Sequence, residues 1–251
     1  MSRRTKTVAS IMLLAFGLSG LGFASYVFLI SRDLPKQSQI RDTILERYPA
    51  RPDATWIPLY DINPKLQQTV ITWEDPTFYS HSGFSPTEIG RSLVRNIKAG
   101  AYIRGGSTIT QQVAKNMYLS REKTLRRKLR EAILARRIEA TLSKREILEI
   151  YLNIADWGPG TQGAEAAAQD YFRKSASDLS WGEAALMAGI LQNPYRLNPK
   201  NHPEDARRKQ LQVLEKLLRH GRLSKEEFID ASTKRQAQSQ QVPRTSNRCH
   251  P

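Results

Sequence analysis

Cysteine is almost absent from this chain. The single residue of this type, Cys249, lies two positions from the end of 251 residues. One thiol supports neither a disulfide framework nor a metal site built from thiolates, and it leaves the redox compartment open. The zinc-ligand spacings and aromatic strand patterns of nucleic-acid-binding modules are also missing, so we expect no nucleic-acid partner.

Acidic residues are scarce compared with basic ones. The chain has 39 Lys and Arg against 24 Asp and Glu, which gives a formal net charge of +15. Such an excess predicts an anionic partner, and without a nucleic-acid module the remaining classes are anionic lipids and phosphorylated substrates. Strand-like alternation is also missing beyond a short hairpin, so the predicted fold class is all-α.

The N-terminal stretch predicts a membrane anchor. Cations at positions 3, 4 and 6 precede an uncharged run from Val8 to Ile30. A helix of that length spans a hydrocarbon core of ~30 Å, and the flanking positive charge places the rest of the chain on the outer face. A cleavable signal peptide is the alternative, because residues 22–25 include small side chains. The apolar run, however, exceeds the about 7–15 residues usual for a signal peptide.

The chain is long enough for one globular domain of roughly 200 residues beside the anchor. We expect a polar tail without fixed structure at the C-terminal end, because it is rich in Gln and Ser. The predicted division is an inner arm (1–7), the anchor (8–30), a juxtamembrane linker (31–54), the globular domain (55–233) and the tail (234–251).

Capping residues and apolar spacing predict a helical domain. The expected helices cover residues 63–73, 86–100, 108–119, 121–142, 143–153, 163–172, 184–191, 203–220 and 224–233. The helix over 184–191 is apolar nearly all round, which predicts that it lies in the core.

The stretch that begins at Glu74 combines two carboxylates, a proline and a histidine. Asp75-Pro76 ends the helix before it, because the residue before a proline is pushed out of the α region. Glu74 is therefore expected at the last turn of an apolar helix, where a glutamate can be tuned into a general base. The alternative is an acidic helix end on a solvated surface.

A second cluster lies on the helix predicted over 121–142. At about 100° per residue, Arg127, Lys128 and Glu131 face one place, with Lys123 nearby. Glu139 falls on the apolar side of the same helix, so we expect it to meet an arginine or a backbone donor. The alternative for the cations is a solvated face with i,i+4 pairs.

Between these two clusters, a Gly-Gly loop precedes a polar helix. Gly106 and Ser107 lead into a helix capped by Thr108, and the free N–H groups and dipole of that end predict an anion site. Gln112 and Lys115 lie one turn apart and can face a ligand together.

Two glutamates on separate segments suggest acid–base chemistry at an anomeric carbon. The cations around Glu131 would keep it ionised, which does not suit the acid of a glycosidase. They suit a leaving group that departs as an anion, such as a diphosphate. The predicted reaction is therefore glycosyl transfer from a sugar diphosphate.

Five motifs in order across roughly residues 55–200 resemble the peptidoglycan glycosyltransferase family, and its monofunctional members most. They begin at Glu74-Asp75, Gly106-Ser107, Arg127-Lys128, Ile147-Leu148 and Ala184. The resemblance implies a lysozyme-like helical domain with a small membrane-associated jaw. It also implies polymerisation of lipid II into β-1,4-linked glycan strands with release of undecaprenyl diphosphate, at the bacterial inner membrane.

The resemblance also assigns roles to residues. Glu74 would be the base for the acceptor hydroxyl, and Glu131 would stabilise the diphosphate, with Mg or Mn as a divalent cation at Glu131 and no organic cofactor. The other residues that would bind substrate or shape the cleft are Asp75, Phe78, His81, Thr108, Gln111, Gln112, Lys115, Lys123, Arg127 and Lys128. Those with a structural role in the site would be Gly83, Gly106, Ser107, Glu139 and Asn153.

One position departs from the family pattern. Lys123 stands where an arginine is usual, and a lysine loses the bidentate geometry toward phosphate. The expected partners are lipid II, the growing strand, the bilayer and other cell-wall synthesis proteins. Apolar side chains around residues 89–103, among them Leu93, Val94, Ile97 and Tyr102, are expected to dip into the bilayer or else to form core.

Two other functions remain open at this stage. A lytic muramidase or lytic transglycosylase on the same kind of fold would shorten strands rather than extend them. An anchored basic scaffold would recruit anionic lipids or other proteins without catalysis.

Overall fold

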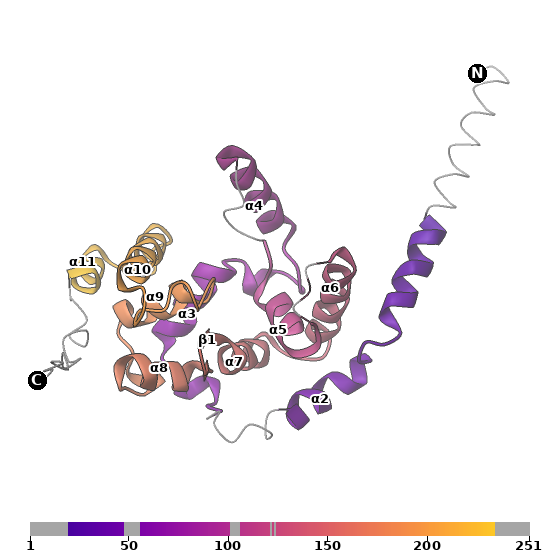
Figure 1. The fold of residues 1–251 in the computed structure, drawn as a ribbon, viewed down its shortest axis with the longest axis horizontal. Helices are drawn as coiled ribbons and strands as arrows, with labels where there is room; N and C mark the ends of the chain where they lie inside the picture. Colours follow the sequence, from indigo (N-terminus) through magenta and orange to yellow (C-terminus); the bar gives the residue numbers. More distant parts are fainter. Residues whose placement is uncertain (1–19, 48–55, 101–105, 121, 123, 234–251) are drawn as a thin grey trace, which may run out of the picture.

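The computed structural model describes residues 20–47, 56–100, 106–120, 122 and 124–233, and the chain within them is mostly helical (Figure 1). The helices are α2 (Ile40–Arg47), α3 (Pro64–Glu74), α4 (Pro86–Ala99), α5 (Ile109–Tyr118), α6 (Leu125–Glu139), α7 (Lys144–Ile154), α8 (Ala164–Phe172), α9 (Trp181–Ile190), α10 (Pro203–Arg219) and α11 (Lys225–Thr233). Short 3₁₀ turns η1 to η4 cover Gln37–Gln39, Leu59–Asp61, Phe78–Ser80 and Ala176–Asp178.

The predicted core helix is confirmed as α9. Every residue from Gly182 to Ile190 is buried, and the helix packs against α3 on one side and α10 on the other. Its apolar surface all round leaves no face for solvent, as expected of a central helix. Because α3 packs directly on this helix, the C-terminal end of α3 is held in a fixed place.

Helix α5 is the central helix of the other half of the domain, as α9 is of the first. It packs between α6 and α7, and Figure 1 shows it near the centre, with α10 and α11 at the opposite end from α6. Its apolar residues Ile109, Val113 and Ala114 are fully buried. Of the polar residues of α5, Gln112 contacts the end of α3, whereas Thr110 and Gln111 are buried.

The β structure of the described residues is one short hairpin. Strands β1 (Asp156–Gly158) and β2 (Thr161–Gln162) pair antiparallel, with Asp156 opposite Gln162 and an irregularity before Gly158. The prediction that no β-run exceeds a short hairpin is consistent with this arrangement, and the helical fold class is confirmed in its main feature.

Residues expected to form a juxtamembrane linker pack on the domain where they are described. Leu34, Ile40 and Ile44 belong to the same buried cluster as the core of the domain. Arg137 on α6 donates hydrogen bonds to the backbone oxygens of Leu34 and Pro35, at 3.2 and 2.7 Å. The proposed boundary near residue 55 stays a prediction, because residues 48–55 lie outside the described ones.

The helix predicted over 121–142 was wrong in its start and its end. Helix α6 begins at Leu125, because the Thr124 side chain caps it by accepting a hydrogen bond from the Arg127 N–H, and it ends at Glu139. Leu125, the first residue of this helix, is 85% exposed. Lys123 lies outside the described residues.

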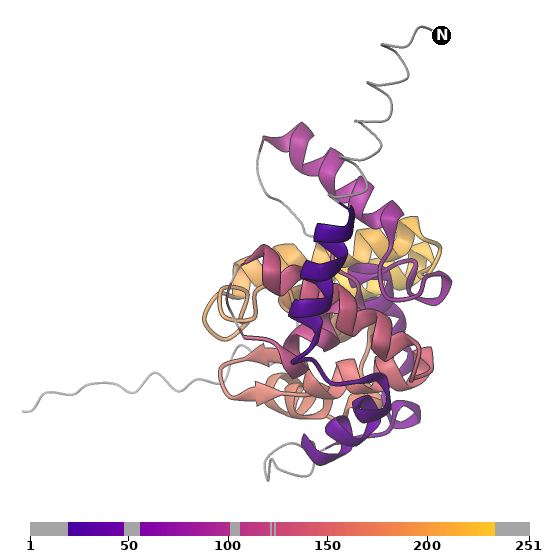
Figure 2. The same cartoon turned by 90° about the vertical axis from the view of Figure 1, so that its right-hand side faces the viewer.

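Helix α4 projects from the body of the domain. In two views at right angles, α4 and the helical residues 20–31 rise on the same side of the molecule (Figures 1 and 2). No helix within the described ranges is both long and apolar enough to cross a membrane. The remaining residues of the predicted anchor, 8–19, lie outside those ranges.

Two glycines of the expected site allow close packing. A Cβ at Gly106 would lie 2.9 Å from the Ile89 Cα, so only glycine lets the loop pass along α4. Gly83 has a φ of +100°, and a Cβ there would lie 3.2 Å from the carbonyl group of Ala135 on α6. The prediction that these glycines have a structural role is supported by these contacts.

We expect Gly83→Ala to lower the free energy of unfolding by about 1–3 kcal/mol, because it combines a strained backbone with a contact to α6. The matched control is Gly160→Ala, since Gly160 also has a positive φ (+74°) but no atom lies within 4 Å of its Cβ position. Urea unfolding followed by circular dichroism measures both. Equal losses in the two variants would show that the contact with α6 has no effect.

Candidate active site

Glu74 is the last residue of α3, as predicted. The helix forms because the Asn63 side chain accepts a hydrogen bond from the Lys65 N–H and Pro64 occupies the first turn. It ends because the next residue, Asp75, leaves the helical conformation, with a φ of −149° and a ψ of 75°. The Gln112 side chain of α5 donates a hydrogen bond from Nε2 to Glu74 Oε2 at 2.8 Å. One oxygen of the carboxylate therefore receives a hydrogen bond from a neutral amide.

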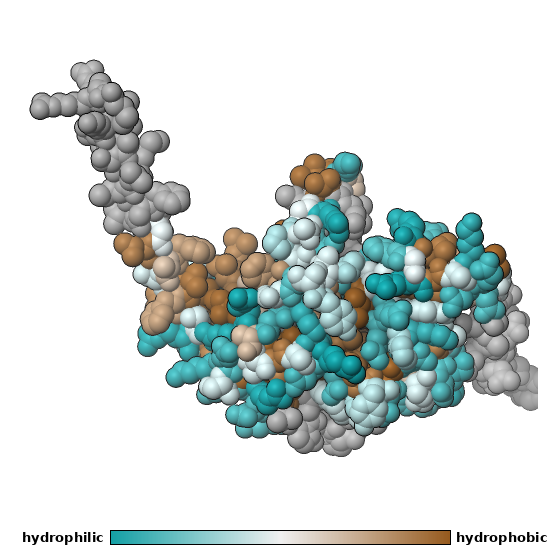
Figure 3. Space-filling model, turned by 180° about the vertical axis from the view of Figure 1, so that it is seen from behind, coloured by the Kyte–Doolittle hydropathy of each residue, from teal (hydrophilic) through white to brown (hydrophobic). Residues whose placement is uncertain are grey.

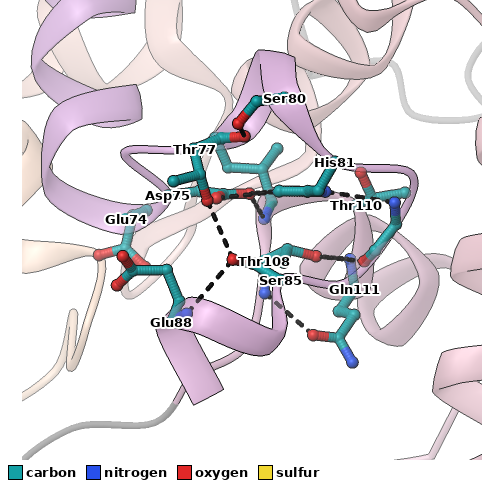
Figure 4. A network of polar contacts seen from close by, with 12 residues as sticks. Glu74, Asp75, Thr77, Ser80, His81, Ser85, Glu88, Thr108, Thr110 and Gln111 are labelled. Carbon is teal, nitrogen blue, oxygen red and sulfur yellow. Dashed lines mark hydrogen bonds and ion pairs between the residues drawn. The ribbon is translucent and has the colours of Figure 1, made fainter. Parts of the chain in front are cut away.

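Asp75 faces in the opposite direction from Glu74 and is 1% exposed. Its carboxylate contacts His81 Nε2 at 2.9 and 3.0 Å and accepts a hydrogen bond from the Ile109 N–H at 3.1 Å (Figure 4). Desolvation raises the pKa of Asp75, and His81 acts in the opposite direction. One buried carboxylate thus joins the end of α3 to the start of α5.

This contact changes the interpretation of the predicted anion site at the start of α5. The Ile109 N–H is used by Asp75, and the Thr108 N–H donates to Gln111 Oε1 at 3.0 Å. The Gln111 N–H in turn donates to the Thr108 hydroxyl oxygen. The anion at this helix end is therefore the protein's own Asp75, and these three N–H groups do not face a ligand.

Thr108 and Gln111 were expected to shape the cleft, and the structure buries them at 1% and 4% exposure. Together they form a capping box, and the Thr108 hydroxyl also donates to the backbone oxygen of Gly83 at 2.6 Å (Figure 4). Their contribution to the site is to fix the loop around Gly83 against α5.

The second carboxylate, Glu131, is held by cations. Arg127 Nη1 lies 2.8 Å from Glu131 Oε2, and Lys128 Nζ contacts Glu131 Oε1. Lys128 also donates to the Ser107 hydroxyl at 2.8 Å. Glu131 is 2% exposed, so its charge depends on these partners. The prediction that Arg127, Lys128 and Glu131 face one place is confirmed.

Lys115 connects the two carboxylates electrostatically. Desolvation lowers the pKa of Lys115, whereas Glu131 and Glu74 both raise it. The residue is also open to solvent, so we expect water to screen the shift. Gln112 on α5 binds Glu74, and Ser107 just before α5 binds the Lys128 partner of Glu131, so both carboxylates lie near α5.

Glu139 has other partners than the sequence predicted. We expected an arginine or a backbone donor, but Lys144 Nζ lies 2.6 Å from Glu139 Oε1 and the Thr110 hydroxyl donates to the same oxygen at 2.5 Å. The Lys144 ammonium also lies 4.5 Å from the centre of the Phe78 ring. Phe78 itself is fully buried. These residues stabilise the site through their contacts with one another and do not line it.

Asn153 has a structural position, as expected. Its side chain accepts a hydrogen bond from the Ile57 N–H at 3.0 Å and donates to the Ile57 oxygen at 2.9 Å. Glu149, one turn earlier, accepts from the Leu59 N–H at 2.9 Å. These bonds fasten the segment before α3 to α7.

Sequence reasoning missed two residues close to Glu74. The Tyr151 hydroxyl donates to Gln112 Oε1 at 3.1 Å. Lys216 on α10 donates to the backbone oxygen of Trp73 at 3.1 Å, across 143 positions of sequence. Tyr151 lies within one of the five motifs, which was a signal for it, whereas no local pattern indicates Lys216.

The described residues do not fit a divalent cation held by the protein at Glu131. Both oxygens of Glu131 are contacted by cationic side chains. Within the described ranges, no group of three or more His, Cys, Asp or Glu side chains could hold a metal ion. No step of the reaction is therefore derived through a metal.

A glutamate that accepts from a neutral amide and a second glutamate held by two cations, both on one helical domain, are consistent with a glycosyl-transferring enzyme. The chain belongs to the transglycosylase family, whose family model matches residues 41–218. That match includes Glu74, Lys115 and Glu131.

Named relatives agree with this assignment. The chain is 42% identical over 177 residues to a biosynthetic peptidoglycan transglycosylase of Thiobacillus denitrificans, over 68% of this chain and 76% of that protein. A protein of the same description from Aromatoleum aromaticum is 41% identical over 201 residues, over 78% and 87% of the two chains. Penicillin-binding protein 1A of Aquifex aeolicus is 37% identical over 242 residues, or 88% of this chain, but only 33% of that longer protein is covered.

The contact between Glu139 and Lys144 gives a test of the site's support. We expect Lys144→Met to lower the free energy of unfolding by about 2 kcal/mol, because it leaves a buried carboxylate without its cation. The double variant Lys144→Met/Glu139→Gln should recover at least half of that loss. Thermal unfolding measures both.

The matched control is Lys200→Met, which removes a more exposed ion pair with Asp170. Its effect should stay within about 1 kcal/mol. A loss of similar size in Lys144→Met and Lys200→Met would contradict the assignment of Glu139 as a buried, dependent charge.

Proposed function

We propose that this chain is a membrane-anchored peptidoglycan glycosyltransferase that polymerises lipid II into β-1,4-linked glycan strands and releases undecaprenyl diphosphate. The observation that carries the proposal is that both carboxylates are tied to α5 and its start: Gln112 donates to Glu74, and Ser107 just before α5 contacts the Lys128 that pairs with Glu131. An acceptor hydroxyl would then lie beside Glu74, and the donor diphosphate would lie beside the cations at Glu131. The two reacting groups would meet in one site next to α5.

Glu74 is proposed to act as the general base. It takes the proton from the 4-hydroxyl of the acceptor sugar as that oxygen attacks the anomeric carbon of the donor. Gln112 holds one carboxylate oxygen through a neutral hydrogen bond, which adds no positive charge that would weaken the base. The new glycosidic bond forms as the bond from the anomeric carbon to the diphosphate oxygen breaks.

The departing lipid diphosphate takes the electron pair of the broken bond. Lys115, Arg127 and Lys128 are proposed to stabilise its negative charge, and Glu131 to hold Arg127 and Lys128 in place. The role of Lys123 in the same task stays a prediction, since this residue lies outside the described ranges.

The arrangement favours transfer to a second sugar over hydrolysis by a pair of carboxylic acids. A paired acid must carry a proton to give to the leaving oxygen. Glu131 instead accepts hydrogen bonds on both oxygens from cations, which is not the apolar environment of such an acid. A diphosphate needs no such proton, because it departs as a stable anion.

The jaw of the proposed lysozyme-like domain is assigned to α4. Ile89, Val94 and Ile97 on this helix are 47%, 52% and 69% exposed, and Phe84 before it is 44% exposed. Figure 3 shows hydrophobic surface at the tip of α4 and along residues 20–31, on the same side of the molecule. The side chain of Leu93 and residues 101–103 lie outside the described parts.

This surface supports an orientation in which α4 and the anchor meet the same bilayer, with the domain on the outer face of the inner membrane. The net charge of +15 would add attraction to anionic headgroups, at roughly 1 kcal/mol per nearby Lys or Arg. Contacts with other cell-wall synthesis proteins remain part of the proposal without a surface assigned to them.

Glu74→Gln tests the role of the base. We expect it to lower the rate of lipid II polymerisation by about 10²–10⁴-fold, because the amide cannot accept the proton. The assay follows both polymer and released lipid diphosphate, with and without a chelator. Glu204→Gln, at an exposed position of α10, is the control and should match the wild type.

Turnover of Glu74→Gln close to the wild-type rate would refute the assignment and leave the scaffold hypothesis. Shortening of preformed strands without release of lipid diphosphate would instead identify a lytic enzyme.

The double variant Val94→Asp/Ile97→Asp tests the jaw. The anchor would keep any variant on the membrane, so the measurement is an environment-sensitive fluorophore at Lys98→Cys in a Cys249→Ser background. With wild-type α4, we expect a blue shift on phosphatidylglycerol vesicles, and the two aspartates should abolish it because charge is excluded from the apolar layer.

Ile229→Asp, at a 59% exposed position of α11, is the control and should keep the shift. A blue shift that survives the aspartates, or a loss of thermal stability showing that these side chains are core, would contradict the proposal.

A further inference from the structure

The side chain of Gln112 bridges Glu74 and a buried phenol. Its Nε2 donates to Glu74 Oε2 at 2.8 Å, and its Oε1 accepts from the Tyr151 hydroxyl at 3.1 Å. The three residues come from α3, α5 and α7, and Tyr151 is only 1% exposed. A continuous chain of hydrogen bonds therefore connects the core of the domain to the carboxylate in the site.

A glutamine amide has a donor end and an acceptor end, and both orientations fit the same space. If the amide turned over, its oxygen would face the Glu74 carboxylate and two acceptors would oppose each other. The Glu74 carboxylate accepts only from the NH₂ end, and the Tyr151 hydroxyl donates to the oxygen end, so both contacts favour the same orientation. Tyr151 thus reinforces the orientation in which the NH₂ group faces Glu74.

The phenol keeps this donor at every pH that the enzyme meets. Desolvation raises the pKa of Tyr151 well above its ordinary value, and the Glu74 and Asp75 carboxylates raise it further. The hydroxyl therefore stays protonated around neutral pH and remains a donor to the amide oxygen.

We propose that Tyr151 is a positioning residue for the transfer reaction, which acts on Glu74 through the Gln112 amide. Its hydroxyl fixes the donor end of the amide toward the carboxylate and so fixes the plane of the carboxylate against the acceptor hydroxyl. The inference rests on the proposed role of Glu74 as the base.

Other ionisable groups around Glu74 do not depend on Tyr151. Lys115 lies on α5 and Asp75 is the next residue in the chain. On α10, Lys216 donates to the Trp73 oxygen, and on α4 Glu88 is paired with Arg91. Loss of the hydrogen bond from the Gln112 amide would disfavour the ionised form of Glu74, while the contacts of the neighbouring ionisable groups stay the same. The acid limb of the pH–rate profile would then move to higher pH.

Tyr151→Phe in the full chain removes only the hydroxyl. We expect kcat for lipid II polymerisation to fall about tenfold while KM stays within about twofold, since substrate is not contacted. We also expect the acid limb of the profile to shift upward by about half a pH unit to one pH unit. A purely structural role would change thermal stability without moving the pH profile.

Tyr171→Phe is the matched control. The Tyr171 hydroxyl is also part of the core and donates at 2.5 Å, but its acceptor is the backbone oxygen of Trp157 beside the hairpin. We expect this variant to lose stability without any shift of the acid limb.

A double-mutant cycle with Gln112→Ala tests whether Tyr151 acts through the amide. In the Gln112→Ala background, Tyr151→Phe should change kcat and the pH profile no further. An unchanged kcat and pH profile in Tyr151→Phe overturns the inference, as does an effect that persists in full without the Gln112 amide.

Should Tyr151→Phe fail to fold, Gln112→Leu and Gln112→Glu on the folded chain replace it, and equal pH profiles in these two variants overturn the inference. Glu74→Gln reports separately on the base itself, so failure of the proposed function is distinguishable from failure of the Tyr151 inference.

Discussion

The structure of the site depends on one buried carboxylate, Asp75. A charge at 1% exposure is tolerated only when its hydrogen bonds are made, and here they come from His81 and from the first N–H of α5. These partners hold the end of α3 against the start of α5. Glu74 precedes Asp75, and Gln112 lies one turn into α5. The contact between Asp75 and α5 therefore also places the Gln112 amide beside the Glu74 carboxylate.

The two glutamates of the site differ because their neighbours differ. Glu74 accepts from a neutral amide, whereas Glu131 accepts from a guanidinium and an ammonium group. In the proposed mechanism, the first arrangement suits a base and the second holds cations where negative charge would develop. Gln112 on α5 contacts Glu74 and Ser107 just before α5 contacts Lys128, so the two proposed roles meet at a single helix.

Local signals predicted the helices and the composition of the site, but they did not predict its long-range contacts. Asn63 and Ser143 cap α3 and α7 as their sequence positions indicate, because a cap involves only neighbouring residues. The hydrogen bond from Ile109 to Asp75 joins residues 34 positions apart, and its effect was to reverse the interpretation of the α5 N-terminus. The bond of Lys216 to α3 is more distant still, and neither contact has a local pattern.

A neutral amide between Tyr151 and Glu74 has a consequence that a direct bond would not have. A phenol bonded directly to the base would lie on a path for the proton into the core. An amide nitrogen does not take up a proton near neutral pH, so Gln112 passes on orientation but no proton. Under the proposed mechanism, the proton taken from the acceptor would therefore stay on Glu74 and would not pass to Tyr151. Tyr151 of α7 would then hold the proposed base in position without competing for the proton that it transfers.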